Sequence, residues 1–530
     1  MPLIYARRIR GWRFILLNLV IGLANVVVLS NVPGYTILGP YAAADLGGVT
    51  PSFGTWATTD HMIGIALGFP IARVLVARFG DYRVYVAALT LYAVISFVCA
   101  TAETIYFFVP VRLALGLVGG VILPVGQGLL LGEYPEKRRV LGVGIWGVLS
   151  MMPFTIGVFM GGWYNENLGW RSLFWSNVPV ALLVAAVVGA LFHGRGFQQR
   201  IARFDMVGYV LLAVVLLSAQ TIFNQGNDFD WLASPFLVAA LIAFVFALPC
   251  FVIWELAERH PAMDLRLFAY RNYAVAVICS VVGFFVIQGL LSLFIVQLQL
   301  LLGYTSSLAG LVYISMIFLS VPLVAVVHVL SRNTDPRAIA CWTFLGFAVT
   351  LTWLGLYDKS GYFDQIALPM IFFGVFLAAF FTPLAALAIQ GLPAKSLGRA
   401  GEELTLLRTA AGAFGIALQG VVLFRRTPFH QLDLADHFGG RRFASLDLYS
   451  QFMNRLQAEG MSMNAARSQT ARFIKQQAGL LALNDAFLLG AAVFVLLAGF
   501  VFLARPVTPP PARAVEKLQQ AEAEEMMEQG

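Results

Sequence analysis

The sequence predicts an all-α membrane protein with about fourteen transmembrane helices. The chain of 530 residues is 59% hydrophobic and only 12% charged, so it has too few polar side chains to cover a water-soluble globule. The apolar residues form runs of about 18 to 25 residues, the length an α-helix needs to cross about 30 Å of hydrocarbon. These observations place the chain in a lipid bilayer.

The apolar runs predict the spans in order along the chain. The first run follows a basic start and is too long for the apolar part of a signal peptide, so we expect it to remain as a span. The predicted spans are 14–38, 53–76, 83–102, 104–131, 140–163, 172–192, 206–223, 234–254, 273–296, 308–330, 338–357, 366–390, 403–423 and 482–504.

Basic residues are distributed unevenly between the loops. The short loops on the N-terminal side hold about twenty Lys and Arg, whereas the opposite short loops hold roughly two, Arg171 and Lys359. Because cytoplasmic loops carry this excess, we expect both termini in the cytoplasm of a bacterial cell and the chain in its inner membrane. The basic residues form no continuous stripe, which argues against a nucleic-acid partner.

One outer loop, 424–481, is long and polar. Its second part has the composition of helices and is punctuated by Gly460 and Gly479, which predicts a helical hairpin. Such a hairpin could dock a partner protein. The stretch after Pro506 combines a proline-rich linker with a short charged segment and predicts a solvated tail.

The loop between the second and third spans carries the first motif. It reads "FPIARVLVARFGDYRVY", where Gly80 between Arg78 and Arg83 predicts a tight turn. This string resembles the signature loop of the major facilitator superfamily. Arg73 and Ala77 stand where that pattern has a glycine and an acid, so the match is partial.

Two further spans carry motifs of the same kind. The fourth span places Arg112 inside hydrocarbon beside a glycine face, which is similar to the buried-arginine motif of the superfamily. In the fifth span, Gly157, Gly161 and Gly162 form a face that lets helices approach closely. Antiporters of this group usually have Gly-Pro here, and Val158 replaces the proline.

Several segments in order along nearly the whole chain resemble the EmrB/QacA subfamily of drug:proton antiporters, and the EmrB-like pumps in particular. They include "WRSLFWSNVPV", "RFDMVGYVLL", "FFTPLAALAIQGLP" and "LLRTAAGAFG". The resemblance implies a six-helix half over 1–200, two inserted helices over 201–260, a second six-helix half over 261–504 and a tail over 505–530. It also implies efflux of small hydrophobic compounds driven by the proton motive force without a cofactor, and work with a periplasmic adaptor and an outer-membrane channel.

Ionisable residues are costly within hydrocarbon and are therefore candidates for proton coupling. Asn31, Asp60, His61 and Arg112 fall at similar depths below the outer surface, so we expect them to share one cavity. EmrB-like proteins commonly have an aspartate where this chain has Asn31. We therefore expect Asp60, with His61, to take over the proton. Two alternatives remain: Asp60 lies in a wet vestibule, or Arg112 is only structural.

The remaining candidates concern gating and cargo. Arg408 in the thirteenth span is expected to face Glu402 as a brace, although a role as a helix-end anchor fits equally well. Cargo binding is expected from apolar walls with a few polar groups. The candidates for this cavity are Asn25, Gln127, Phe154 and Gln288.

Other function classes have weaker support in the sequence. The string from Gly142 to Gly147 fits GxGxxG by letter but follows no strand, and Walker A, HExxH and GxSxG patterns are missing. The histidines lack the spacing of metal ligands. We therefore expect neither an enzyme nor a metal site. A proton-coupled importer of an organic anion and a non-transporting membrane scaffold stay as alternatives.

Overall fold

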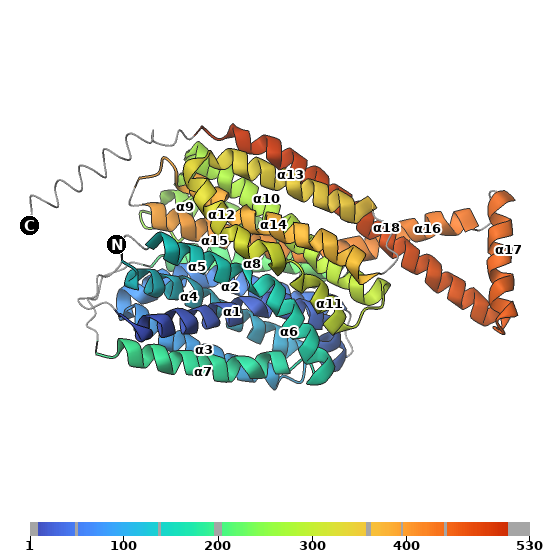
Figure 1. Ribbon diagram of the computed structural model, residues 1–530, viewed down its shortest axis with the longest axis horizontal. Helices are drawn as coiled ribbons and strands as arrows, with labels where there is room; N and C mark the ends of the chain where they lie inside the picture. The colour runs from blue at the N-terminus through green and yellow to red at the C-terminus, as the bar shows by residue number, and fades with distance from the viewer. Residues whose placement is uncertain are drawn as a thin grey trace, which may run out of the picture.

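The computed structural model describes residues 9–47, 51–135, 139–194, 204–356, 362–393, 396–438 and 443–506. In these ranges the regular structure is helical throughout. Figure 1 shows long helices packed side by side in a bundle, with an arm projecting from one end. We call this end the arm end. The opposite end, where the first and last described residues lie, is the terminal end. The predicted tail from 507 onward falls outside the described residues, as do Lys137, Arg138 and Lys359.

The helices of the N-terminal half are α1 (Trp12–Asp45), α2 (Pro51–Phe79), α3 (Asp81–Ala100), α4 (Ile105–Glu133), α5 (Arg139–Met151), α6 (Pro153–Asn167) and α7 (Ser172–Phe192). The fifth predicted span is thus divided into α5 and α6. Pro153 starts α6, since its missing N–H costs least at the first turn of a helix. Two helices follow, α8 (Met206–Gln225) and α9 (Pro235–Ala257).

The helices of the C-terminal half are α10 (Arg271–Val296), α11 (Ser306–Ile314), α12 (Ile317–Asn333), α13 (Pro336–Leu356), α14 (Phe363–Ile389) and α15 (Leu397–Val421). The described residues hold 13 helical segments that are long and apolar enough to span a membrane. α15 is not among them, because it carries Arg399, Glu402, Glu403 and Arg408. It nevertheless packs between α2 and α10 within the bundle, so the fold agrees with the predicted fourteen spans.

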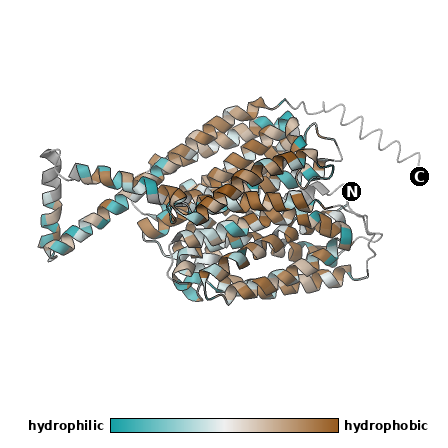
Figure 2. Ribbon diagram, turned by 180° about the vertical axis from the view of Figure 1, so that it is seen from behind, coloured by the Kyte–Doolittle hydropathy of each residue, from teal (hydrophilic) through white to brown (hydrophobic). Residues whose placement is uncertain are grey.

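The arm is built by the segment predicted as the outer loop. A π-helical turn (Val422–Arg426) leads into α16 (Thr427–Phe438), α17 (Phe443–Ala458) and α18 (Met463–Phe500). Gly460 makes the predicted turn with φ +91°. The break predicted at Gly479 is wrong: this glycine lies inside α18, where it costs only about 1 kcal/mol relative to alanine. The arm and the last span therefore share one helix of 38 residues, and Figure 2 shows that helix changing from hydrophilic to hydrophobic along its length.

The glycine motifs have the structural roles predicted for them. Gly80 connects α2 and α3 with φ +90°, a backbone conformation that favours glycine. On α6, a Cβ added at Gly157 or Gly161 would collide with the backbone of α1, and one added at Gly162 would collide with Ser306 of α11. The glycine face of α6 therefore allows close packing within the N-terminal half and against the C-terminal half.

Candidate functional site

The centre of the N-terminal half is a buried polar cluster around Arg112 of α4. The Arg112 side chain has 0% exposure. Its Nη1 donates to Oδ1 of Asn31 at 3.3 Å and its Nη2 donates to the backbone oxygen of Asn31 at 3.4 Å. The guanidinium also lies 4.6 Å from the ring centre of Tyr35 and 5.3 Å from that of Phe174. Neutral oxygens and aromatic faces therefore stabilise this buried cation.

Asn31 of α1 connects the other members of this cluster. Its Nδ2 donates to the Tyr92 hydroxyl at 2.8 Å and to the Val27 carbonyl at 3.0 Å. Its Oδ1 also accepts a hydrogen bond from Asn177 of α7 at 3.4 Å. An amide can donate and accept at once. Asn31 thereby joins α1, α3, α4 and α7 without a negative charge.

His61 of α2 belongs to the same cluster through the backbone of α4. Its Nδ1 lies 3.1 Å from the carbonyl oxygen of Arg112. Because a carbonyl can only accept, Nδ1 carries a proton. Nε2 is buried and has no hydrogen-bond partner among the described residues. No acid among the described residues pairs with this ring, and an unpartnered buried Nε2 beside the Arg112 cation fits a neutral imidazole.

Asp60 is separated from this cluster, which contradicts the expectation of one shared cavity. Successive residues of a helix are rotated by about 100°, so Asp60 leaves α2 on a different side from His61. Met62 contacts Gln288 of α10, and residues two apart lie on nearly opposite sides of a helix. Asp60 therefore points away from the interface between the halves. Its carboxyl is buried, and no described residue forms an ion pair with it.

A polar seam joins α2 to α8 beside Asp60. Gln220 of α8 donates to the hydroxyl of Thr59, and Asn224 donates to the same hydroxyl at 3.3 Å. At the arm end of the seam, Ser52 donates to Asp228. Gln220 and Asn224 are four residues apart on α8, so they lie on one face, and Asp228 follows the end of this helix. The inserted helix α8 is thus held to the N-terminal half by hydrogen bonds.

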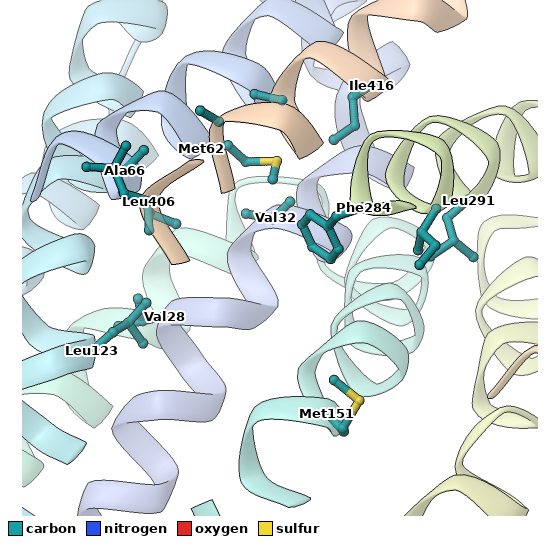
Figure 3. Packing of buried hydrophobic residues seen from close by; sticks show 14 of the residues in the cluster. Val28, Val32, Met62, Ala66, Leu123, Met151, Phe284, Leu291, Leu406 and Ile416 are labelled. Carbon is teal, nitrogen blue, oxygen red and sulfur yellow. The ribbon is translucent and has the colours of Figure 1, made fainter. Parts of the chain in front are cut away.

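A small cavity lies between the two halves. It has a volume of about 20 Å³ and is lined by residues of α1, α6, α10, α11 and α15, among them Val32, Phe154, Gln288 and Ile416. Figure 3 shows Val32 and Phe284 facing one another from α1 and α10 at this interface. Sites for drug-sized ligands occupy about 300 to 1,000 Å³. This conformation is therefore occluded, with room for little more than a water molecule.

The predicted cargo residues fall into two groups. Phe154 and Gln288 line the cavity between the halves. Asn25 and Gln127 do not line it: Asn25 donates to the Leu149 carbonyl of α5 at 3.0 Å, and Gln127 is half-buried on α4. The sequence could place these residues at a depth but not on a side of their helices.

The predicted contact between Arg408 and Glu402 is not formed. Glu402 pairs instead with Arg73 of α2 at 3.7 Å, and Arg399 pairs with Glu403 at 3.0 Å. A separation of six residues is about 9 Å along a helix and points the two side chains apart. The Arg73–Glu402 pair connects the two halves near the terminal end. Arg408 lies on the rings of Phe381 and Phe284.

At the arm end the halves are held together by direct contacts between α6 and α11. The Asn165 amide donates to the Ser306 hydroxyl at 3.1 Å, and the Ser307 backbone N–H donates to Glu166 at 2.8 Å. Gly162 lets the two backbones approach at this point. Near the terminal end the Arg73–Glu402 pair is one-third exposed. The arm end is thus the more tightly closed of the two.

Sequence reasoning missed several members of the buried cluster. Tyr35, Tyr92 and Asn177 were not singled out, because aromatic and amide residues are common in apolar helices. Gln220 was missed as well, although α8 buries three amide side chains, Gln220, Asn224 and Gln225, within an apolar run. That combination is the signal that could have identified it.

Comparison with known proteins extends these observations. The family model of the Major Facilitator Superfamily matches residues 14–418. The Multidrug export protein EmrB of Haemophilus influenzae is 29% identical over 94% of this chain and 97% of its own length. The Fatty acid resistance protein FarB of Neisseria gonorrhoeae is 28% identical over the same shares of the two chains.

A similar fold is found among solved structures. The crystal structure of an auto-inhibited POT family peptide transporter superposes with a TM-score of 0.57 and 14% identity, over 92% of this chain and 97% of that one. At this identity the likeness concerns the fold alone. Together with the helical bundle and its interface cavity, the family match shows that this chain is a multi-span membrane transporter that belongs to the major facilitator superfamily.

Proposed function

We propose that the protein exports small hydrophobic toxic compounds across the bacterial inner membrane in exchange for protons. The observation that carries the proposal is the occluded cavity, which has apolar walls from both halves and a few polar groups such as Gln288. Apolar walls favour hydrophobic cargo, and a site shared by two halves can open to either side as they move. The relatives named for multidrug export and fatty acid resistance support the direction of transport.

The proton is assigned to Asp60. It is a carboxyl within the bundle, buried to 7% exposure and without an ion pair among the described residues. Such a group can be protonated and deprotonated as its access to water changes. Its place beside the α2–α8 seam puts this step away from the cargo cavity, so coupling would pass through movement of α2.

The orientation and the partners complete the proposal. Basic residues at the terminal end, among them Arg78, Arg266 and Arg337, favour the cytoplasmic side for that end. The arm would then project into the periplasm. Its α17 and α18 pack through Met453, Leu456 and Ala466 and present polar surface beyond the bilayer. We assign this arm to docking of a periplasmic adaptor that leads to an outer-membrane channel.

The test is transport by the pure protein in sealed liposomes. A lipophilic fluorescent dye inside the vesicles should leave faster when a pH gradient is imposed, and collapse of the gradient should abolish the difference. Accumulation of an organic anion with proton flux in the same direction would favour the importer instead. A natively folded protein that moves no cargo under any gradient would refute transport and favour a scaffold.

A further inference from the structure

Arg408 is a cation in the middle of the membrane part of the C-terminal half. It lies eleven residues after Leu397, where α15 starts, and thirteen before Val421, where α15 ends. At 1.5 Å per residue it is about 16 Å from the start of the helix. A charge at this depth is costly, and such residues usually have a partner.

Arg408 has no polar partner within the described part of the chain. No hydrogen bond or ion pair is formed by its guanidinium, which lies 4.5 Å from the ring centre of Phe381 and 5.7 Å from that of Phe284. The acids nearest in sequence are engaged elsewhere, Glu402 by Arg73 and Glu403 by Arg399. The five donors of the guanidinium are therefore available to a ligand.

The face of α15 that carries Arg408 is turned toward the other half. Arg408, Gly412 and Ile416 are four residues apart and share this face. Ile416 lines the interface cavity, and a Cβ added at Gly412 would touch Met62 of α2 and Phe284 of α10. A ligand in an expanded cavity could thus extend along this row to the guanidinium.

Aromatic rings from both halves connect Arg408 to the cavity. Phe154 of α6 packs against Phe284 and Phe381 with ring centres 6.2 and 6.4 Å apart. Phe154 also lines the cavity. The chemistry of this site is therefore one forked cation at the end of an apolar aromatic wall, which complements a molecule with one anionic group and a hydrophobic body.

We propose that Arg408, with Phe154, Phe284 and Phe381, forms a subsite for the carboxylate of lipophilic acids. The planar guanidinium pairs with a carboxylate through two parallel hydrogen bonds, while the acyl chain or ring system occupies the apolar cavity. This inference rests on the proposed export function and specifies its substrate class. Neutral compounds would use the cavity without Arg408.

Binding of dodecanoate and of dodecanamide to the purified protein tests this subsite. The two probes share their chain and differ in charge. Loss of one member of a buried charge pair costs about 2 kcal/mol or more, which is about thirtyfold in affinity. We expect the wild type to prefer dodecanoate and Arg408→Gln to lose that preference by about this factor, with dodecanamide affinity unchanged. Arg408→Lys should retain part of it, because lysine keeps the charge without the fork.

Arg426→Gln is the matched control, because it removes an exposed arginine of the arm that pairs with Asp485. Its preference for dodecanoate over dodecanamide should equal that of the wild type. An unchanged preference in Arg408→Gln, or an equal loss for both probes, would overturn the inference. If Arg408→Gln is not monodisperse, Arg408→Lys takes its place. An unchanged preference of Arg408→Lys for dodecanoate over dodecanamide would overturn the inference, and a reduced preference would support it. Gradient-driven export of a neutral dye would continue if the subsite were wrong and would be missing if the proposed function were wrong.

Discussion

Two arginines inside the bundle, Arg112 and Arg408, have opposite surroundings. Arg112 of the N-terminal half donates hydrogen bonds to Asn31 and lies inside a cluster that also includes His61 and Asn177. Arg408 of the C-terminal half contacts the rings of Phe381 and Phe284, forms no hydrogen bond within the described residues, and lies at the interface between the halves. Two nitrogens of the first arginine are held by hydrogen bonds within the fold, whereas no donor of the second is held in this way among the described residues. Position within the membrane part of the bundle alone therefore does not separate a structural cation from a ligand-binding one, and the hydrogen-bond partners do.

The largest expected effect contrasts the two arginines directly. Arg112→Gln should lower the free energy of unfolding by about 3 kcal/mol, because two hydrogen bonds from a charged donor are lost at about 1.5 kcal/mol each. Arg408→Gln should change it by less than about 1 kcal/mol, because no polar partner is left unpaired. Thermal unfolding in detergent, followed by tryptophan fluorescence, measures both. An equal loss of stability in the two variants would contradict the distinction between Arg112 and Arg408.

The second prediction asks whether an acid outside the Arg112 cluster carries the proton. Asp60→Asn keeps the size of the side chain but removes its ability to bind and release a proton. We expect efflux driven by a pH gradient to fall by about tenfold or more, equivalent to about 1.4 kcal/mol, while exchange of cargo without a gradient persists. Flux measurements in liposomes with and without the gradient separate the two. Full gradient-driven flux in Asp60→Asn would show that another group carries the proton.

The third prediction converts the neutral cluster into an ion pair. In Asn31→Asp a carboxylate would face the Arg112 guanidinium at the present 3.3 Å, and Tyr92 could donate its O–H in place of accepting. We expect a gain of about 1 kcal/mol in the free energy of unfolding, since hydrogen bonds between charged groups are stronger than those of an amide. The unfolding temperature at neutral pH checks this. A lower temperature would mean that the lost bond to Val27 outweighs the pairing.

The smallest effect is expected at the seam between α2 and α8. Gln220→Leu removes the hydrogen bond to Thr59, and such bonds between membrane helices contribute about 0.6 kcal/mol on average. The unfolding temperature should fall slightly. Val210→Leu, at a half-exposed position of the same helix, is the control and should have no effect. A loss of several kcal/mol in Gln220→Leu would show that α8 is an essential part of the N-terminal half.

Much of the fold followed from the sequence because a membrane helix is recognised locally. Its backbone satisfies its own hydrogen bonds, and its length is set by the bilayer, so apolar runs located the spans to within a few residues. Gly80 and Gly460 marked turns for a similarly local reason, their positive φ. Gly479 did not, because an isolated glycine is tolerated inside a helix when other forces hold it.

The tertiary structure decided which neighbouring helix each polar residue faces. Depth follows from counting residues at 1.5 Å each, and it correctly brought Asn31, His61 and Arg112 together. The direction of the side chain rotates by about 100° about the helix axis at every residue, so Asp60 and His61 face different neighbours although they are adjacent in sequence. The sequence does not show how α2 is rotated against those neighbours. The sequence alone thus determined which residues lie in the membrane and at what depth. Only the packing of the helices decided that Arg112 donates to Asn31 and that Arg408 faces the interface between the halves.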